Sequence, residues 1–247
     1  MDTDTNIKNS LYNDFDKNFE IAFTMSEQNF SHEEIINMLT KGNIQEKQIA
    51  ALKFDRIKSV DDVKVLLNNL TGCDGKIREA VAHKIHKILL YNTDVHDLFA
   101  KNCAIKFADA TIDINANICR LIVDSAALLA EFNDFSYSYV KRIITFTLEA
   151  LSELDKFIFR DKKYVINKQL FKLYWCLEAL CTFYDYADEQ TLYEILKKCA
   201  IQKEYTVREK VAQIIINSGK FNDIKELLIN DENYYVRQVL NHPSLLK

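Results

Sequence analysis

The chain has 247 residues, of which 48% are hydrophobic, and a formal net charge of −4 at pH 7. This composition can bury the core of one long domain or two short ones, and the acidic balance argues against a general nucleic-acid binder. Four glycines and one proline are too few for the turns of a sheet-rich chain of this length, so long helices joined by short polar turns are expected.

Residues 1–20 are polar and acidic, and they lack the basic start and apolar core of a signal peptide. No run of about 18 apolar residues is present, so no membrane span is expected. We expect residues 1–30 to form a polar tail or a first helix, residues 31–247 to form one repeat domain, and the protein to be cytoplasmic. Six cysteines without a C-x-x-C pair fit that compartment as reduced core thiols.

Regular helical patterning begins at a capping box, in which Ser31 and Glu34 satisfy each other's backbone amides. From there the chain alternates two kinds of helix, which we name A and B. After the first pair, A helices are predicted at residues 59–70, 95–108, 139–154, 189–200 and 222–229. B helices share a related sequence and are centred on Ile49, Val81, Ile118, Leu170, Val211 and Leu240. Such a recurrence predicts an α-solenoid.

Three B helices begin with the same pattern, a polar residue followed three and four positions later by an aliphatic residue and arginine. These stretches are Asp74–Arg78, Glu204–Arg208 and Asn233–Arg237. The pattern resembles the HEAT-repeat family from about residue 32 to the end. The resemblance implies an all-α, right-handed α-solenoid of about five to six helix pairs. In the other copies the arginine position is taken by Glu46, Asn115 and Asn167, and the widest spacing predicts an inserted loop near residues 159–164.

The recurring arginines fall inside an apolar helical face. With Glu79 at 0° on a helical wheel, Arg78 lies at about 260°, among residues expected to be buried. The resemblance implies that Arg78, Arg208 and Arg237 each reach an acidic or carbonyl partner at a turn between repeats, where Asp74 lies. An arginine can bury its stem and deliver its charge to such an acceptor. Ligand binding is the alternative, but recurrence with the repeat favours a structural role.

The polar side of the B helices carries the candidate binding residues, because the resemblance implies that B helices line the concave face. Glu79, His83 and His86 share that side of one B helix, opposite its apolar face. The corresponding positions of later copies contain Arg120, Lys168, Lys172 and Trp175. Trp175 with Lys168 and Lys172 would bind an acidic peptide or phosphate, since tryptophan often anchors binding surfaces. Packing of Trp175 into the core is the alternative.

Enzymatic and metal-binding motifs are weak or missing. Glu79, His83 and His86 have a spacing that could gather three metal ligands, but a solvated face is the better interpretation, and we expect neither metal nor cofactor. The sequence contains no Gly-rich phosphate loop, G-x-S-x-G or H-E-x-x-H motif. No single Ser, Cys or Asp can be assigned as a catalytic nucleophile while its partner residues are unknown.

The sequence therefore predicts a non-enzymatic scaffold that binds a protein or peptide on its concave face. The rival is a HEAT-like DNA glycosylase for alkylated bases, a family that uses an aromatic-lined, basic cleft and a carboxylate. Only Phe54 and Trp175 supply aromatic rings at the predicted concave row, and Glu178 would have to face the same way as Trp175. A pigment-lyase-like solenoid is a further alternative, but no residue of the sequence specifically supports it.

Overall fold

The computed structural model describes residues 27–156 and 163–241 and divides the chain into two compact units, one ending at Ile88 and the other beginning at Leu89. All regular secondary structure in these described residues is helical, which confirms the all-α prediction. None of the described helices combines the length and the apolar character needed to cross a bilayer.

The first unit contains α2 (His32–Lys41), α3 (Ile44–Lys53), α4 (Val60–Leu70) and most of α5 (Gly75–Tyr91). A capping box starts each of the first three helices, with Ser31, Asn43 and Ser59 as the N-cap residues. The predicted capping box at Ser31 is thus confirmed. In this unit α2 packs against both α3 and α4.

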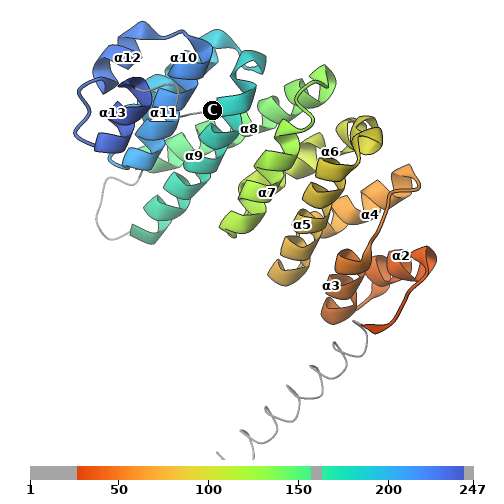
Figure 1. Ribbon diagram of the computed structural model, residues 1–247. Coiled ribbons are helices and arrows are strands. Elements are labelled where there is room, and N and C mark those ends of the chain that lie inside the picture. Colours follow the sequence, from red (N-terminus) through yellow and green to blue (C-terminus); the bar gives the residue numbers. More distant parts are fainter. Residues whose placement is uncertain (1–26, 157–162, 242–247) are drawn as a thin grey trace, which may run out of the picture. The chain divides into compact units, whose positions relative to one another are not determined.

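The second unit continues the alternation of A and B helices (Figure 1). It contains α6 (His96–Thr111), α7 (Ala116–Ala127), α8 (Asn133–Lys156), α9 (Lys163–Phe183), α10 (Glu189–Cys199), α11 (Tyr205–Ser218), α12 (Asn222–Leu228) and α13 (Tyr234–Asn241), with short 3₁₀ turns at Thr93–Val95 and Tyr184–Tyr186. Even-numbered helices match the predicted A segments and odd-numbered helices match the B segments. From α2 to α13 the described residues therefore form six helix pairs.

Helices of one kind stack on each other in the second unit. The A helix α8 contacts α6 and α10, while the B helices α7, α9, α11 and α13 contact one another in chain order. This two-layer stacking is the arrangement of an α-solenoid. The aromatic rings of Phe107, Phe135, Tyr139 and Phe183 pack in the core, and Tyr139 shares a buried hydrogen bond of 2.8 Å with Thr111.

The predicted loop near residues 159–164 is only partly described. Residues 159–162 lie outside the described residues, whereas Lys163 and Tyr164 belong to α9, so the loop prediction is wrong for these two. The wide spacing is taken up in part by helix length, because α8 has 24 residues and α9 has 21. Residues 1–26 of the predicted tail also lie outside the described residues.

Candidate functional site

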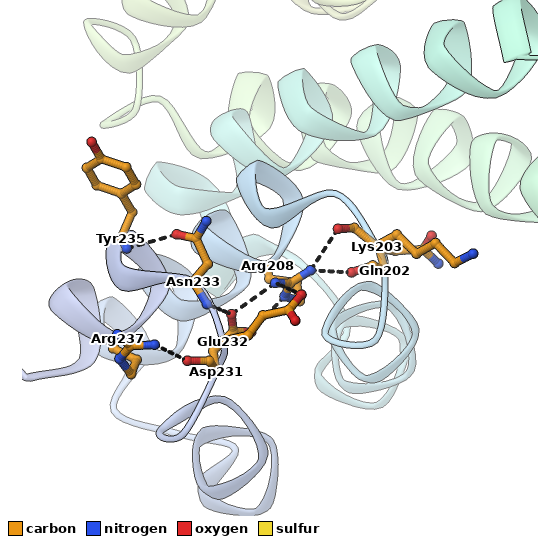
Figure 2. A network of polar contacts seen from close by, with 8 residues as sticks. All are labelled: Gln202, Lys203, Arg208, Asp231, Glu232, Asn233, Tyr235 and Arg237. Carbon is orange, nitrogen blue, oxygen red and sulfur yellow. Dashed lines mark hydrogen bonds and ion pairs between the residues drawn. The ribbon is translucent and has the colours of Figure 1, made fainter.

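Arg208, in α11, joins two consecutive helix pairs (Figure 2). Its Nε and Nη2 atoms donate to the two carboxylate oxygens of Asp231 at 2.6 and 2.9 Å. Its Nη1 donates to the carbonyls of Gln202 and Lys203 at 2.7 and 2.9 Å. Only 6% of Arg208 is exposed, and its hydrogen bonds lower the pKa of Asp231. A bidentate pair of this kind is strong and fixes geometry, so it braces the turn before α11 against the turn before α13.

The other two recurring arginines bond to the backbone of their own turns. Arg78 donates to the carbonyl of Cys73, and Arg237 donates to the carbonyl of Asp231. Both side chains are half-buried. Asp74 accepts a hydrogen bond from the backbone nitrogen of Lys76 at 2.8 Å, so its carboxylate serves the first turn of α5.

Backbone hydrogen bonds at the helix starts correct the predicted alignment of the third copy. The nitrogen of Arg237 donates to the carbonyl of Asn233, and in the same way the nitrogen of Cys119 donates to the carbonyl of Asn115. Cys119 Sγ also donates to the carbonyl of Asp113 at 3.1 Å, six residues earlier, as Arg237 does to Asp231. Cys119 therefore occupies the arginine position, and the prediction that Asn115 does so is wrong by one helical turn.

The error has a simple cause, because Ile114 and Ile118 are both aliphatic and stand one turn apart. Ile114 is 81% exposed, whereas Ile118 is fully buried, so Ile118 is the true counterpart of Ile77 in α5. The corrected polar row of α7 holds Arg120, Asp124 and Ala127, which are all exposed. Arg120 stays in the row and donates to Asn117 Oδ1 of its own helix at 3.0 Å.

The burial pattern of α9 also corrects the fourth copy. From Arg208 onward the buried positions of α11 are Arg208, Lys210, Val211, Ala212, Ile214 and Ile215; Val207 before them is also buried, whereas its counterpart Lys172 is half-buried. The same spacing recurs in α9 as Leu173, Trp175, Cys176, Leu177, Ala179 and Leu180. Trp175 therefore corresponds to Lys210, and the predicted equivalence of Lys168, Lys172 and Trp175 with Glu79, His83 and His86 is wrong. The sequence around Trp175 is apolar on every side of the helix, so its faces could not be separated.

Trp175 is a buried side chain with an unpaired donor. It is 8% exposed, and its ring lies at 5.1 Å from that of Tyr174 and 6.3 Å from that of Phe171, measured between centroids. Its Nε1 atom is covered and has no acceptor among the described residues. A buried donor without an acceptor costs about 1–3 kcal/mol. The indole is thus placed in the packing between helices, as in the core alternative, but its polar atom remains unsatisfied.

One stripe of α9 nevertheless holds Lys168, Lys172 and Trp175. The two lysines are four residues apart and Trp175 follows three residues later, so all three side chains leave the helix on the same side. Lys168 is exposed and Lys172 is half-buried, and within residues 27–156 and 163–241 neither forms an ion pair. Lys210, the counterpart of Trp175, reaches back to the preceding B helix, where it lies 5.3 Å from the ring of Tyr174.

Because Lys210 reaches back to the preceding B helix and Trp175 is its counterpart, we infer that the Trp175 stripe lies towards α7, which contacts α9. The counterpart of Tyr174 in α7 is Arg120. We name the set Arg120, Lys168, Lys172 and Trp175 the α7–α9 seam.

A second polar cluster joins α9 and α11. The Lys210 ammonium pairs with the Glu178 carboxylate and donates to Gln213 Oε1 at 2.9 Å. Burial acts against the charge of Lys210, but Glu178 outweighs it and the pKa of Lys210 is raised. Beside the pair, burial raises the pKa of the Cys181 thiol to about 12. Because the ion pair joins α9 to α11, it ties two repeats together.

In the first unit, Glu79 and His86 are half-buried and His83 is exposed on α5. Among residues 27–156 and 163–241, no group of three or more His, Cys, Asp or Glu side chains is placed to hold a metal ion. Phe54, the other ring of the predicted row, is 1% exposed and packs at 5.7 Å from the His32 ring, so its predicted place on the concave face is wrong.

Sequence reasoning missed Asp231 as the partner of Arg208 and Lys210 as the partner of Glu178. A buried lysine is rare, and Lys210 stands in a stretch that reads as an ordinary amphipathic helix. One signal was available: Lys210 aligns with Trp175 once the apolar spacing is matched, and an apolar counterpart predicts a buried position. Asp231 had no comparable signal, since acidic residues are common in turns.

No model of a protein family matches the sequence, and no curated protein matches it. Among solved structures, the chain is similar to an engineered protein at 13% identity, with a TM-score of 0.48, over 85% of this chain and 93% of the other. It is also similar to a designed armadillo repeat protein at 14% identity, with a TM-score of 0.45, over 85% of this chain and 97% of the other.

Proposed function

We propose that this chain is a HEAT-like, non-enzymatic scaffold that binds a protein or peptide along its B-helix face. The stacked B helices of the second unit present one continuous series of side chains from α7 to α13. Such a surface can hold an extended partner without an enclosed pocket.

The α7–α9 seam carries this proposal. Two other cations of the B helices are engaged by the fold, Arg208 by Asp231 and Lys210 by Glu178. On the seam, two lysines and an indole N–H have no hydrogen-bond or ion-pair partner within the described residues. Groups with unused bonding capacity on a rigid helix are what a binding surface requires.

An array of short synthetic peptides of varied charge and hydropathy tests the proposal. We expect some peptides to bind the full chain, and we expect a charge reversal on the B-helix face, Arg120→Glu, to change their affinity. The matched reversal Lys198→Glu, on the exposed side of the A helix α10, should leave binding unchanged. The proposal fails if no peptide binds, or if only the α10 change weakens binding.

The glycosylase alternative has less support. Both rings that would line its cleft, Phe54 and Trp175, are buried, and the nearby carboxylate of Glu178 is paired with Lys210. Release of an alkylated base from duplex DNA by the purified chain would nevertheless replace the scaffold proposal with this one.

A further inference from the structure

We propose that the α7–α9 seam recognises an acidic peptide segment, with a carboxylate that accepts a hydrogen bond from Trp175 Nε1 and pairs with Lys172. This rests on the proposed scaffold function and names the chemistry of its partner.

The unpaired indole donor is the first observation. Trp175 is more than nine-tenths buried, yet its Nε1 has no acceptor among the described residues. An indole nitrogen can only donate, so the missing group must be an acceptor. A carboxylate is the strongest acceptor that a peptide side chain supplies, because hydrogen bonds to ionised groups are shorter and stronger than neutral ones.

The charge of the seam is the second observation. Lys168 and Lys172 lie on the same stripe of α9 as the indole, and Arg120 is the α7 counterpart of the neighbouring Tyr174. Two carboxylates of these helices have partners of their own: Glu178 pairs with Lys210, and Asp124 on α7 has a polar partner. The seam thus presents positive charge that its own acidic neighbours do not neutralise, and it complements a partner with several carboxylates.

The geometry favours a peptide over a single-stranded nucleic acid. Bases bind such proteins by stacking on exposed aromatic faces, whereas the Trp175 ring is 8% exposed and is flanked by Phe171 and Tyr174. What Trp175 offers is an N–H donor and not a ring face. Because Nε1 is covered, an acceptor reaches it only when neighbouring side chains move, so binding must change the surroundings of the indole.

This coupling gives a direct measurement, because Trp175 is the only tryptophan of the chain. A tryptophan-free peptide of alternating Glu and Ser is titrated into the full chain, and the indole emission is followed. We expect a saturable change in emission that weakens as salt is added. A peptide of alternating Lys and Ser, inorganic phosphate and oligothymidine are titrated in parallel and should give no change. A stronger response to oligothymidine or phosphate than to the Glu peptide overturns the proposal.

Two variants separate the parts of the site. Lys172→Gln should lower the affinity for the Glu peptide by roughly tenfold, as expected for the loss of one charge-assisted contact. Lys198→Gln on α10 is the control and should bind like the unmodified chain. Trp175→Phe keeps an aromatic ring and removes the donor, and calorimetry should show a similar loss. Unchanged affinity in Trp175→Phe or in Lys172→Gln overturns the assignment.

Failure of this inference is distinguishable from failure of the scaffold function. If neutral or basic peptides of the array bind and the Glu peptide does not, the acidic partner is wrong and the scaffold stands. If no peptide of any charge binds, both proposals fall.

Discussion

The guanidinium of Arg208 and the carboxylate of Asp231 form a buried, two-point ion pair between the turns that precede α11 and α13. Both side chains are less than one-tenth exposed. Since removal of one partner leaves the other charge buried without compensation, Arg208→Ala should lower the free energy of unfolding by about 3 kcal/mol. Urea denaturation of the full chain measures it. Arg120→Ala, at an exposed position, is the control and should change stability by less than about 0.5 kcal/mol.

Arg78→Ala should cost less than Arg208→Ala, because the Arg78 side chain is half-buried whereas only 6% of Arg208 is exposed. The order of the two losses is the test. Equal losses would mean that the deeper burial of the Arg208–Asp231 pair adds nothing to stability.

The same pair predicts a pH dependence. The folded pKa of Asp231 lies below its ordinary value of 3.8, chiefly because Arg208 donates to it. Its contribution to stability is therefore complete above pH 3.8 and is lost as the pH falls through the lower folded pKa. Asp231→Asn should be less stable at neutral pH and should lose less stability on acidification. If the free energy of unfolding falls equally with decreasing pH in Asp231→Asn and in the unmodified chain, this prediction is wrong.

The Lys210–Glu178 pair predicts a pH dependence of stability at the alkaline end of the range. The folded pKa of Lys210 is raised above the ordinary value of 10.5, because Glu178 outweighs burial. The stabilisation is complete below pH 10.5 and is lost as the pH rises through the folded pKa. Lys210→Met should flatten the alkaline limb of the stability curve. Glu178→Ala should destabilise by about 2 kcal/mol at pH 7, since it leaves the Lys210 ammonium covered and unpaired.

Two substitutions of Trp175 separate the contribution of its ring packing to stability from that of its indole N–H. Trp175→Ala should lower the free energy of unfolding by about 3–5 kcal/mol, because it leaves a large cavity. Trp175→Phe keeps much of the ring and removes the unpaired donor, so its loss should be below about 1.5 kcal/mol. Thermal melts followed by circular dichroism compare the two. A loss for Trp175→Phe well above about 1.5 kcal/mol would show that the indole nitrogen is hydrogen-bonded in solution.

Thiol reactivity should follow burial. Burial raises the pKa of the Cys176 thiol to about 12, whereas Cys73 is half-buried. Because the thiolate is the reactive form, Cys73 should be alkylated first in the folded protein, and Cys176 only on unfolding. Mass spectrometry of peptides after timed alkylation gives the order. A pair of cysteines that stays unmodified after unfolding without reductant would indicate a disulfide.

The order of A and B helices was predictable because each helix has one apolar side, and that side repeats at helical spacing. The register of the copies was harder. Ile114 and Ile118 fit the apolar position equally well, and only the burial of Ile118 separates them. In α9 the apolar residues surround the helix, so Trp175 could not be assigned to a face. The partners of Arg208 and Lys210 lie in neighbouring repeats, and no local pattern reports a contact of that kind.

The Arg208 brace also gives the stack a direction under mechanical load. Arg208 holds the carbonyls of its own turn and the carboxylate of the following one, so the tie points from α11 towards the C-terminal pair. A chain pulled from that end would release α13 first, and the next residues to leave would be those around Asp231. The ion pair would then bear force before the contact of α9 with α11 does, so unravelling should pause at α11.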